Sequence, residues 1–447
     1  MSAPRLFGTD GMRGHAGKWP LDPPTVRRLG AALVRVLGDS SGPMRLLIGR
    51  DTRESGDWIT REFGHGARLS GAEVVSAGVV PTPAVAYLSR TTDVSLGAMI
   101  SASHNPFEDN GIKVFSGAGQ KFTEEVERRV EQEVADSSWS VPDGEAPDVA
   151  STDLVAKYAA HLREVLPSAG ALAGTRLVVD CANGATTSVA PVIFESLGFA
   201  VEWLGARPDG RNINLGCGST HPEVMAGKVG PVGAIAGIAF DGDGDRVIFA
   251  DEDGRVVDGD GVMLICARHL KALGRLSGDT VVATVMSNIG LELALKDSGI
   301  ALRRTQVGDK YVMEEMLTGG FSLGGEQSGH VIFSDYLFTG DGLATALSVL
   351  GVMAATGRTL GSLASELTTY PQVLVNVRVK ERRALESVPT LAEAVRKVES
   401  SLVGHGRLLV RYSGTEPLLR IMLEGRDKAE IDTLAHDLAD VVKRELG

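Results

Sequence analysis

The segment Ala234-Ile-Ala-Gly-Ile-Ala-Phe-Asp-Gly-Asp-Gly-Asp-Arg-Val-Ile-Phe-Ala250 places three carboxylates, separated by glycines, between two apolar runs of strand length. Short apolar runs that alternate with helical patterns predict buried strands of open α/β sheets, and the ligand-binding loops of such sheets leave the carboxyl ends of the strands. Asp241, Asp243 and Asp245 therefore fall where a ligand is expected. Carboxylate oxygens are the ligands that Mg²⁺ prefers, often together with phosphate oxygens, so this loop predicts a magnesium site.

A second loop, Ser101-Ala-Ser-His-Asn-Pro106, follows another apolar strand at 96–100. Within it, Ser103 stands beside a histidine and close to an asparagine. A serine that carries a phosphoryl group would give a phosphate oxygen to a metal held by the aspartates. The two loops together predict a metal-assisted phosphoryl-transfer centre built on a phosphoserine, although the serine loop taken alone is as compatible with an ordinary turn.

Two other kinds of site are excluded by the residues that flank these loops. The three aspartates, with Glu252, have the spacing of EF-hand calcium ligands. However, Arg246 occupies the position of the sharp-turn glycine, and both flanks have strand patterns where an EF-hand needs helices. Ser103 also lacks the G-x-S-x-G surroundings of an α/β-hydrolase nucleophile.

Composition and charge indicate a globular protein with more than one domain. The chain has 447 residues, of which 43% are hydrophobic and 23% charged. A formal net charge of −12 argues against nucleic-acid binding, and the apolar runs are too short for a membrane span. No signal-peptide pattern opens the chain, and three cysteines without metal-type spacing suit a reducing compartment, so we expect a cytoplasmic protein.

Strand and helix patterns alternate in four blocks, and the segment 136–153, rich in Ser, Pro, Asp and Gly, is the clearest linker. Thr123 is expected to cap the helix that follows it, which begins with acidic residues. The expected strands are 46–48, 96–100, 176–180, 234–240, 247–250, 280–284, 301–305, 321–325, 373–379, 407–412 and 419–423. The other expected helices are 58–69, 189–197, 291–298, 343–355, 390–400 and 429–444.

Six motifs, in order along the chain, carry a resemblance to a known family. They are Leu6-Phe-Gly-Thr-Asp-Gly-Met-Arg-Gly14, the serine loop with Asn110-Gly-Ile-Lys113, Asn212-Ile-Asn-Leu-Gly-Cys-Gly-Ser-Thr-His221, the aspartate loop, Gly325-Glu-Gln-Ser-Gly-His330, and Arg411-Tyr-Ser-Gly-Thr-Glu-Pro417. With these motifs the chain resembles the α-D-phosphohexomutase superfamily nearly from end to end. The resemblance implies an α/β protein with four domains around a central cleft, at 1–150, 151–252, 253–367 and 368–447. The first three are expected to be alike in fold, and the fourth to be a smaller α+β unit.

The resemblance also implies roles at the reacting end of a phosphosugar substrate. Ser103 is expected to carry the phosphoryl group, and its oxygen joins the three aspartates as a ligand of Mg²⁺. Four further residues match family positions close to the transferred phosphoryl group: Lys113, Arg246, Arg13 and His104. The last two could equally orient loops. Lys113 and His330 are both candidates for the general base, and the sequence does not choose between them.

At the other end of the substrate, five residues match a phosphate clamp by family position and by type: Arg411, Ser413, Gly414, Thr415 and Arg420. Guanidiniums and hydroxyls donate hydrogen bonds to phosphate, and a glycine lets backbone amides approach it. A plain turn between strands is the alternative. Glu326 and Ser328 match the loop that contacts sugar hydroxyls, or else they only cap the strand at 321–325.

The resemblance is strongest to the branch of the superfamily that acts on glucosamine phosphates. It implies conversion of glucosamine 6-phosphate to glucosamine 1-phosphate, with glucosamine 1,6-bisphosphate as intermediate and that compound or glucose 1,6-bisphosphate as activator. The product would feed UDP-N-acetylglucosamine and cell-wall synthesis.

The phosphomannomutase/phosphoglucomutase branch is the alternative, although it usually has Met at the position of Gln327. An alternative of another class is a non-catalytic phosphosugar-binding protein. Tyr412 departs from the Pro that many relatives carry. A homodimer is compatible with the family, and neither nucleic acid nor a membrane is an expected partner.

Overall fold

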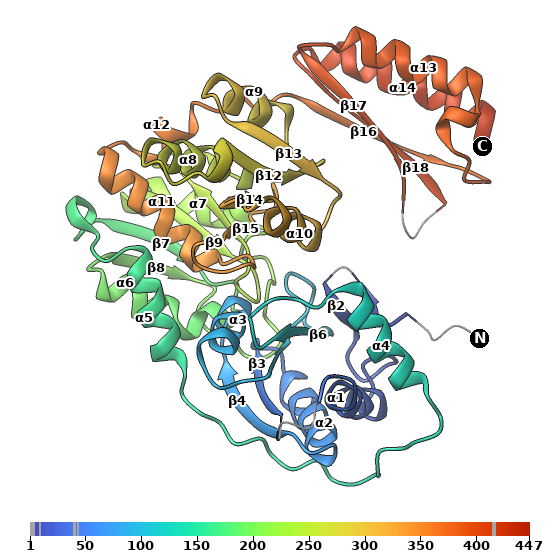
Figure 1. Ribbon diagram of the computed structural model, residues 1–447. Coiled ribbons are helices and arrows are strands. Elements are labelled where there is room, and N and C mark those ends of the chain that lie inside the picture. Colours follow the sequence, from blue (N-terminus) through green and yellow to red (C-terminus); the bar gives the residue numbers. More distant parts are fainter. Residues whose placement is uncertain (1–4, 9, 39–41, 43, 414–416) are drawn as a thin grey trace. The chain divides into compact units, whose positions relative to one another are not determined.

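The computed structural model describes residues 5–8, 10–38, 42, 44–413 and 417–447 (Figure 1). Within this part of the chain, the strands form four sheets of six, five, four and three strands. The residues group into two compact units, and the last sheet lies in the second of them, Val285–Ala301 with Glu366–Gly447. Three α/β sheets and a smaller C-terminal sheet confirm the expected fold class.

The first sheet has the strand order β1-β2-β6-β5-β3-β4. Strand β5 pairs in parallel with β3 and antiparallel with β6, so the chain reverses directly after β5. The connection at this reversal is the serine loop. The strands are β1 (Phe7–Gly8), β2 (Gly11–His15), β3 (Arg45–Arg50), β4 (Glu73–Val79), β5 (Leu96–Ile100) and β6 (Asp109–Ser116), and the helices are α1 (Pro23–Leu37), α2 (Gly56–Leu69), α3 (Thr82–Thr91) and α4 (Glu124–Ala135).

The second sheet, with the order β11-β10-β9-β7-β8, also contains a strand with one parallel and one antiparallel neighbour. Strand β9 pairs in parallel with β7 and antiparallel with β10, and the connection between β9 and β10 is the aspartate loop. The strands are β7 (Arg176–Asp180), β8 (Ala200–Leu204), β9 (Ala236–Phe240), β10 (Val247–Ala250) and β11 (Val256–Val257), and the helices are α5 (Val155–Val165), α6 (Ala190–Ser196) and α7 (Pro222–Val232), with short 3₁₀ turns at Gly170–Leu172 and Ala185–Ser188.

The third sheet, β13-β12-β14-β15, has the same arrangement around β14. Strand β14 pairs in parallel with β12 and antiparallel with β15, and their connection holds Glu326 and Ser328. Each α/β sheet thus presents one motif at the reversal that follows a parallel strand. The strands are β12 (Thr280–Thr284), β13 (Ala301–Thr305), β14 (Leu323–Gly325) and β15 (Val331–Phe333), and the helices are α8 (Gly259–Ala272), α10 (Asp309–Gly319), α11 (Gly342–Thr356) and α12 (Leu360–Ala364), with a 3₁₀ turn at Ser277–Asp279.

The C-terminal sheet, β16-β18-β17, is antiparallel throughout. Helices α13 and α14 lie side by side along it (Figure 1), and the sheet and helices enclose a core of their own that includes Leu391, Leu419 and Ile421. Helix α9 belongs to the same unit. The elements are α9 (Ile289–Asp297), β16 (Gln372–Arg378), α13 (Pro389–Ser401), β17 (Gly406–Tyr412), β18 (Leu418–Gly425) and α14 (Lys428–Leu446), with a 3₁₀ turn at Leu385–Ser387.

The strands and helices expected from sequence patterns are present, and their bounds differ from the expected ones by at most two residues. The expectation for Thr123 is confirmed only in part. Thr123 stands at the N-cap of α4 but its hydroxyl makes no capping hydrogen bond, and the acidic first turn, with Glu124 and Glu125, remains as the stabilising feature of that helix end.

The expected linker contains neither helix nor strand between residues 136 and 154, apart from a bridge between Ser76 and Ser151. It packs against the first domain, where the buried Arg27 donates to the carbonyls of Pro142 at 2.9 Å and Gly144 at 3.0 Å. The four domain boundaries given above remain a prediction.

Among the described residues, no helix is both long and apolar enough to cross a lipid bilayer. The three cysteines, Cys181, Cys217 and Cys266, are buried and free, and burial raises the pKa of the Cys266 thiol to about 12.

Helices α1 and α2 of the first domain cross with their backbones unusually close to each other. A Cβ atom on Gly66 would lie 1.8 Å from the carbonyl oxygen of Arg27, and one on Gly30 would lie 2.1 Å from that of Phe63. Only glycine fits at this crossing, and the close approach lets apolar side chains of both helices, such as Leu29 and Phe63, pack in one core with the sheet.

Gly66→Ala should therefore destabilise the protein, because the new methyl group meets a backbone carbonyl rather than a flexible side chain. Overpacking of this kind costs about 1–3 kcal/mol, and we expect a lower melting temperature. Gly227→Ala is the matched control: this exposed glycine inside α7 has nothing within 4 Å of a new Cβ, and the change should stabilise the helix by about 0.5–1 kcal/mol. Equal melting temperatures of the two variants would contradict the close crossing.

Candidate active site

Ser103 lies at the reversal between β5 and β6 and is 1% exposed. Its φ of 53° is in the left-handed region, which non-glycine residues rarely adopt unless their surroundings enforce it. Its backbone N–H donates to Ser101 Oγ at 2.9 Å, and Ser101 in turn donates to Asp51 Oδ2 at 2.6 Å. These bonds hold the serine in a strained conformation, and its hydroxyl donates to Asp241 Oδ2 at 2.5 Å.

The serine loop is held by hydrogen bonds from Arg53, a residue that the sequence analysis did not identify as part of the site. Its side chain and that of Asp51 are 0% exposed, and they pair at 2.9 Å. The remaining guanidinium hydrogens go to four loop carbonyls, those of Ser103 at 2.9 Å, Asn105 at 2.8 Å, Asp109 at 3.0 Å and Pro106. The signal in the sequence was a charged pair, Asp51 and Arg53, directly after the apolar strand β3.

A second missed residue is Asn214, which lies in the 212–221 motif of the second domain. Its amide donates to the carbonyls of Ser103 at 2.9 Å and Asn105 at 3.2 Å. This motif, conspicuous in the sequence but without an assigned role, therefore ties the second domain to the serine loop.

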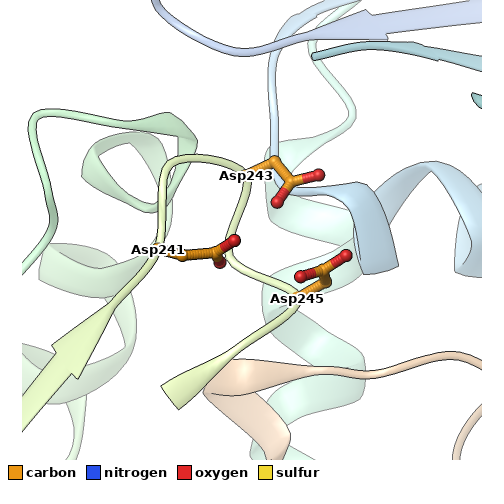
Figure 2. A group of neighbouring side chains, drawn as sticks. All are labelled: Asp241, Asp243 and Asp245. Carbon is orange, nitrogen blue, oxygen red and sulfur yellow. The ribbon is translucent and has the colours of Figure 1, made fainter. Parts of the chain in front are cut away.

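The three aspartates gather on one loop with their carboxylates turned toward one another (Figure 2), and their ligand atoms all lie within 4.8 Å of one another. They are 0%, 0% and 3% exposed, in chain order. The loop lies so close to the serine loop that a Cβ on Gly242 would be 2.5 Å from the carbonyl oxygen of Ser103. Gly242 is needed for this approach, whereas a Cβ on Gly244 would meet the side chains of Thr186 at 2.6 Å and Pro81 at 3.2 Å.

The three carboxylates of this cluster repel one another in their charged forms. Burial, together with Asp245 and Asp243, raises the pKa of Asp241 well above its usual range. One oxygen of Asp243 and one of Asp245, both named Oδ1, are buried without a hydrogen-bond partner in the described structure. Three neighbouring carboxylates, with buried oxygens that have no hydrogen-bond partner, offer the oxygen ligands that a hard divalent cation requires, so the residues present fit a metal.

Lys113, on β6, brings positive charge to the same place. Its ammonium lies 2.8 Å from Asp243 Oδ2, 2.8 Å from Asp245 Oδ2 and 3.0 Å from Asp10 Oδ2. Burial lowers the pKa of Lys113, but Asp10 and the two aspartates outweigh this and raise it well above its ordinary value.

Asp10 was not expected at the site, although it stands inside the first of the six motifs. It pairs with Arg13, as well as with Lys113 and Lys121. Burial raises the pKa of Asp10, but these three cations hold it far below its usual range. Arg13 is thereby brought to the edge of the aspartate cluster.

His104 and Arg246 lie on the other side of Ser103. Arg246 donates to His104 Nδ1 at 3.2 Å, so this nitrogen is an acceptor and the ring proton sits on Nε2. The same nitrogen is 3.2 Å from Ser103 Oγ. Burial, with the charges of Arg246 and Arg13, lowers the pKa of His104 to about 4, so the ring is neutral at physiological pH.

His330 is buried between Asp245 and Asp309. Its Nε2 accepts from the N–H of Gly340 at 3.0 Å, and its Nδ1 lies 3.7 Å from Asp245 Oδ1. Burial lowers the pKa of His330, but the interactions with Asp245 raise it above its ordinary value. The ring therefore lies beside the aspartate cluster, close to one oxygen of Asp245.

The connection between β14 and β15 divides its residues between the interior and the surface. Glu326 is buried and accepts from the N–H of Gly308 at 3.2 Å, whereas Ser328 is exposed on the turn. Gln327 donates from its side chain to Asp258 Oδ2 at 3.0 Å, at the N-cap of α8. Its side chain therefore anchors the loop.

The described residues of the expected phosphate clamp all lie in the C-terminal unit. Arg411 and Arg420 are directly opposite each other on β17 and β18, and the Arg420 guanidinium lies 3.4 Å from the Oγ of the buried Ser413. Burial and the charge of Arg420 lower the pKa of Arg411. Like charges directly opposite each other on paired strands repel one another. Gly414 and Thr415 lie outside the described residues.

Four family models match the chain. They are phosphoglucomutase/phosphomannomutase, alpha/beta/alpha domain I at residues 4–140, domain II at 156–254 and domain III at 258–370, and the C-terminal domain of the same family at 374–441.

Relatives at high identity are phosphoglucosamine mutases. One from Desulforudis audaxviator is 49% identical over 98% of this chain and 97% of its own length. Another, from Solibacter usitatus, is 48% identical over 99% of both chains.

Solved structures agree on the fold. A phosphoglucomutase/phosphomannomutase family protein from Burkholderia thailandensis matches with a TM-score of 0.80 at 23% identity, over 100% of this chain and 98% of that one. N-acetylphosphoglucosamine mutase from Aspergillus fumigatus, solved with GlcNAc-6P and magnesium, matches with a TM-score of 0.66 at 18% identity, over 99% and 96%.

The fold and the buried serine–aspartate centre together define a phosphohexomutase, an enzyme that moves a phosphoryl group between two positions of one sugar. At nearly half identity over almost its full length, the chain belongs to the phosphoglucosamine mutase family.

Arg53→Lys should lower turnover by about a hundredfold or more. A lysine ammonium cannot replace the hydrogen bonds that the guanidinium donates to four carbonyls of the serine loop. Each hydrogen bond to a charged donor contributes about 1.5–3 kcal/mol, and every 1.4 kcal/mol at the transition state is tenfold in rate. Arg61→Lys, on the surface of α2 with a side chain 41% exposed, is the control and should leave kcat unchanged. Wild-type kcat in the Arg53 variant would show that the loop holds its shape without the guanidinium.

Proposed function

We propose that the chain interconverts glucosamine 6-phosphate and glucosamine 1-phosphate through a phosphoserine at Ser103. The observation that carries this proposal is the contact of 2.5 Å between the Ser103 hydroxyl and Asp241, inside a buried cluster of three carboxylates. The substrate is supported by the relatives named phosphoglucosamine mutase at 48–49% identity.

In the first half-reaction, the C1 hydroxyl of glucosamine 6-phosphate attacks the phosphorus on Ser103. A bond forms between that phosphorus and O1, the bond to Ser103 Oγ breaks, a base takes the sugar hydroxyl proton, and a proton returns to Ser103. In the second, Ser103 Oγ attacks the phosphorus of the 6-phosphate in the resulting glucosamine 1,6-bisphosphate. The bond from that phosphorus to O6 breaks and the serine proton passes to O6, which leaves glucosamine 1-phosphate and restores the phosphoserine. No phosphate is lost, and glucosamine or glucose 1,6-bisphosphate would reload an enzyme that has lost its phosphoryl group.

The three aspartates, with an oxygen of Ser103 or of its phosphate, would hold Mg²⁺. All of these ligands are oxygens, which suits this ion better than a softer metal. When bound, Mg²⁺ neutralises charge on the transferred phosphoryl group. Phosphorylation adds about −1.5 to −2 charge at neutral pH, so the chain's own cations, Arg246 and Lys113, are needed beside it.

The remaining assignments keep the roles expected from the family match. Arg13 and His104 would lie close to the transferred phosphoryl group or else orient the loops around it. Lys113 or His330 would take the proton, and because the pKa of Lys113 is raised well above its ordinary value, Lys113 would first have to give up its own proton. Glu326 and Ser328 would contact sugar hydroxyls. The non-reacting phosphate would bind between Arg411 and Arg420, where Ser413 adds a hydroxyl and Gly414 and Thr415 follow. A cytoplasmic location, supported by three free buried cysteines, and a homodimer also remain predictions.

Removal of divalent metal should abolish activity, and Mg²⁺ should restore it. Asp243→Asn should lose at least tenfold more activity than Glu430→Gln, an exposed change on α14, because it removes a buried carboxylate from the cluster. Added Mg²⁺ should also raise the melting temperature of the wild type, since a ligand that binds only the folded state stabilises it, and the shift should shrink in Asp243→Asn. Activity that persists in excess chelator would refute the metal assignment.

The substrate is tested by comparing glucosamine 1-phosphate, glucose 1-phosphate and mannose 1-phosphate in one assay with saturating bisphosphate. One polar contact to the C2 amine corresponds to roughly ten- to a hundredfold discrimination, about 1.4–2.8 kcal/mol, so kcat/KM should be highest for the glucosamine compound. Equal or higher kcat/KM for glucose or mannose phosphate would favour the phosphomannomutase/phosphoglucomutase branch. Binding without turnover of all three would indicate a non-catalytic phosphosugar-binding protein.

A further inference from the structure

Two ion pairs join the first and third α/β domains, and the lysine comes from the first domain in one pair and from the third domain in the other. Lys121, which bridges to Phe115 of β6, pairs with Asp309 at the start of α10. The next residue along, Lys310, pairs in the other direction with Glu127 of α4 at 3.1 Å. We call these two contacts the charge clasp.

The charge clasp is largely buried. The side chains of Lys121 and Asp309 are 10% and 11% exposed, and those of Lys310 and Glu127 are 6% and 18% exposed. Desolvation of a buried ion pair offsets most of its attraction, and apolar side chains of similar size often stabilise a protein as well or better. Stability is therefore a poor explanation for the clasp, whereas a pair of reciprocal charges does fix the register of two surfaces.

On the side of the first domain, the clasp is connected to the reacting centre. Lys121 also binds Asp10 Oδ1 at 2.6 Å, and the other oxygen of Asp10 lies 3.0 Å from Lys113 Nζ. Lys113 in turn binds Asp243 and Asp245. A displacement of Lys121 would thus change the surroundings of the aspartate cluster.

On the side of the third domain, the clasp is connected to the loop that is expected to contact the sugar. Asp309 Oδ2 lies 3.6 Å from His330 Nε2, and the N–H of Gly308, directly before it, donates to Glu326 at 3.2 Å. The beginning of α10 therefore carries both the clasp residues and a direct contact to the Glu326 loop.

We propose that Lys121, Lys310 and Glu127 are positioning residues that set the Glu326 loop at a fixed distance from Ser103. This inference rests on the proposed mutase activity, in which a bisphosphate is held between these loops in two successive orientations. A loosened clasp leaves the chemistry intact but lets the intermediate escape before its second half-reaction. The enzyme then depends more on bisphosphate supplied from solution.

The test measures kcat, KM, melting temperature and the concentration of glucose 1,6-bisphosphate that gives half-maximal rate. Lys310→Glu and Glu127→Lys should each lower kcat at least tenfold and raise the bisphosphate requirement at least fivefold. The double variant that exchanges the two charges should recover to within about threefold of the wild type. Asp440→Lys with Lys443→Glu, an exposed pair on α14, is the matched control and should change nothing.

A variant with methionine at both 127 and 310 separates positioning from stability. It should keep the wild-type melting temperature within a few degrees and still show the higher bisphosphate requirement. Wild-type kinetics in this variant, or a melting temperature lower by ten degrees or more, would each overturn the proposal, the second because it would make the clasp structural. Absence of mutase activity in the wild type would instead refute the proposed function itself.

Discussion

Three carboxylates buried next to a serine hydroxyl are the constraint on which the rest of this structure depends. Charges of one sign in a poorly solvated space repel one another, and burial adds to the cost. The protein meets this with cations drawn from different elements, Lys113 from β6 and Arg246 from the end of the aspartate loop. Two carboxylate oxygens, Oδ1 of Asp243 and of Asp245, remain buried without a hydrogen-bond partner in the described structure, and the cluster that they belong to could hold a metal ion.

All three α/β domains place their functional motif at the same kind of connection between strands. In each, a parallel strand is followed by an antiparallel one, and the tight reversal carries the motif. Because these reversals meet at short distances, small residues are required where they touch. Gly242 lies against the serine loop, and a Cβ on Gly340 would come within 2.6 Å of both the carbonyl oxygen of Asp245 and the His330 ring.

Local patterns in the sequence were sufficient to predict the strands at the centre of each sheet, because apolar runs are local properties. They also drew attention to the three aspartates and Ser103, which the structure brings together. For residues whose contacts span long separations, local patterns did not reveal the partner. Arg53 binds the carbonyl of Ser103 across 50 positions of sequence, Asn214 across 111, and Lys310 reaches Glu127 across 183. Gln327, used as a marker of the glucosamine branch, faces Asp258, so its identity reports how the loop is anchored.

The most direct test of the central claim is phosphopeptide mapping by mass spectrometry after incubation with glucose 1,6-bisphosphate and Mg²⁺. The account predicts one phosphate, on the peptide that contains Ser103. It also predicts that Ser103→Ala carries no phosphate and loses several orders of magnitude in turnover, while its melting temperature stays near that of the wild type. A phosphate on another residue, or near-normal turnover in Ser103→Ala, would contradict the account.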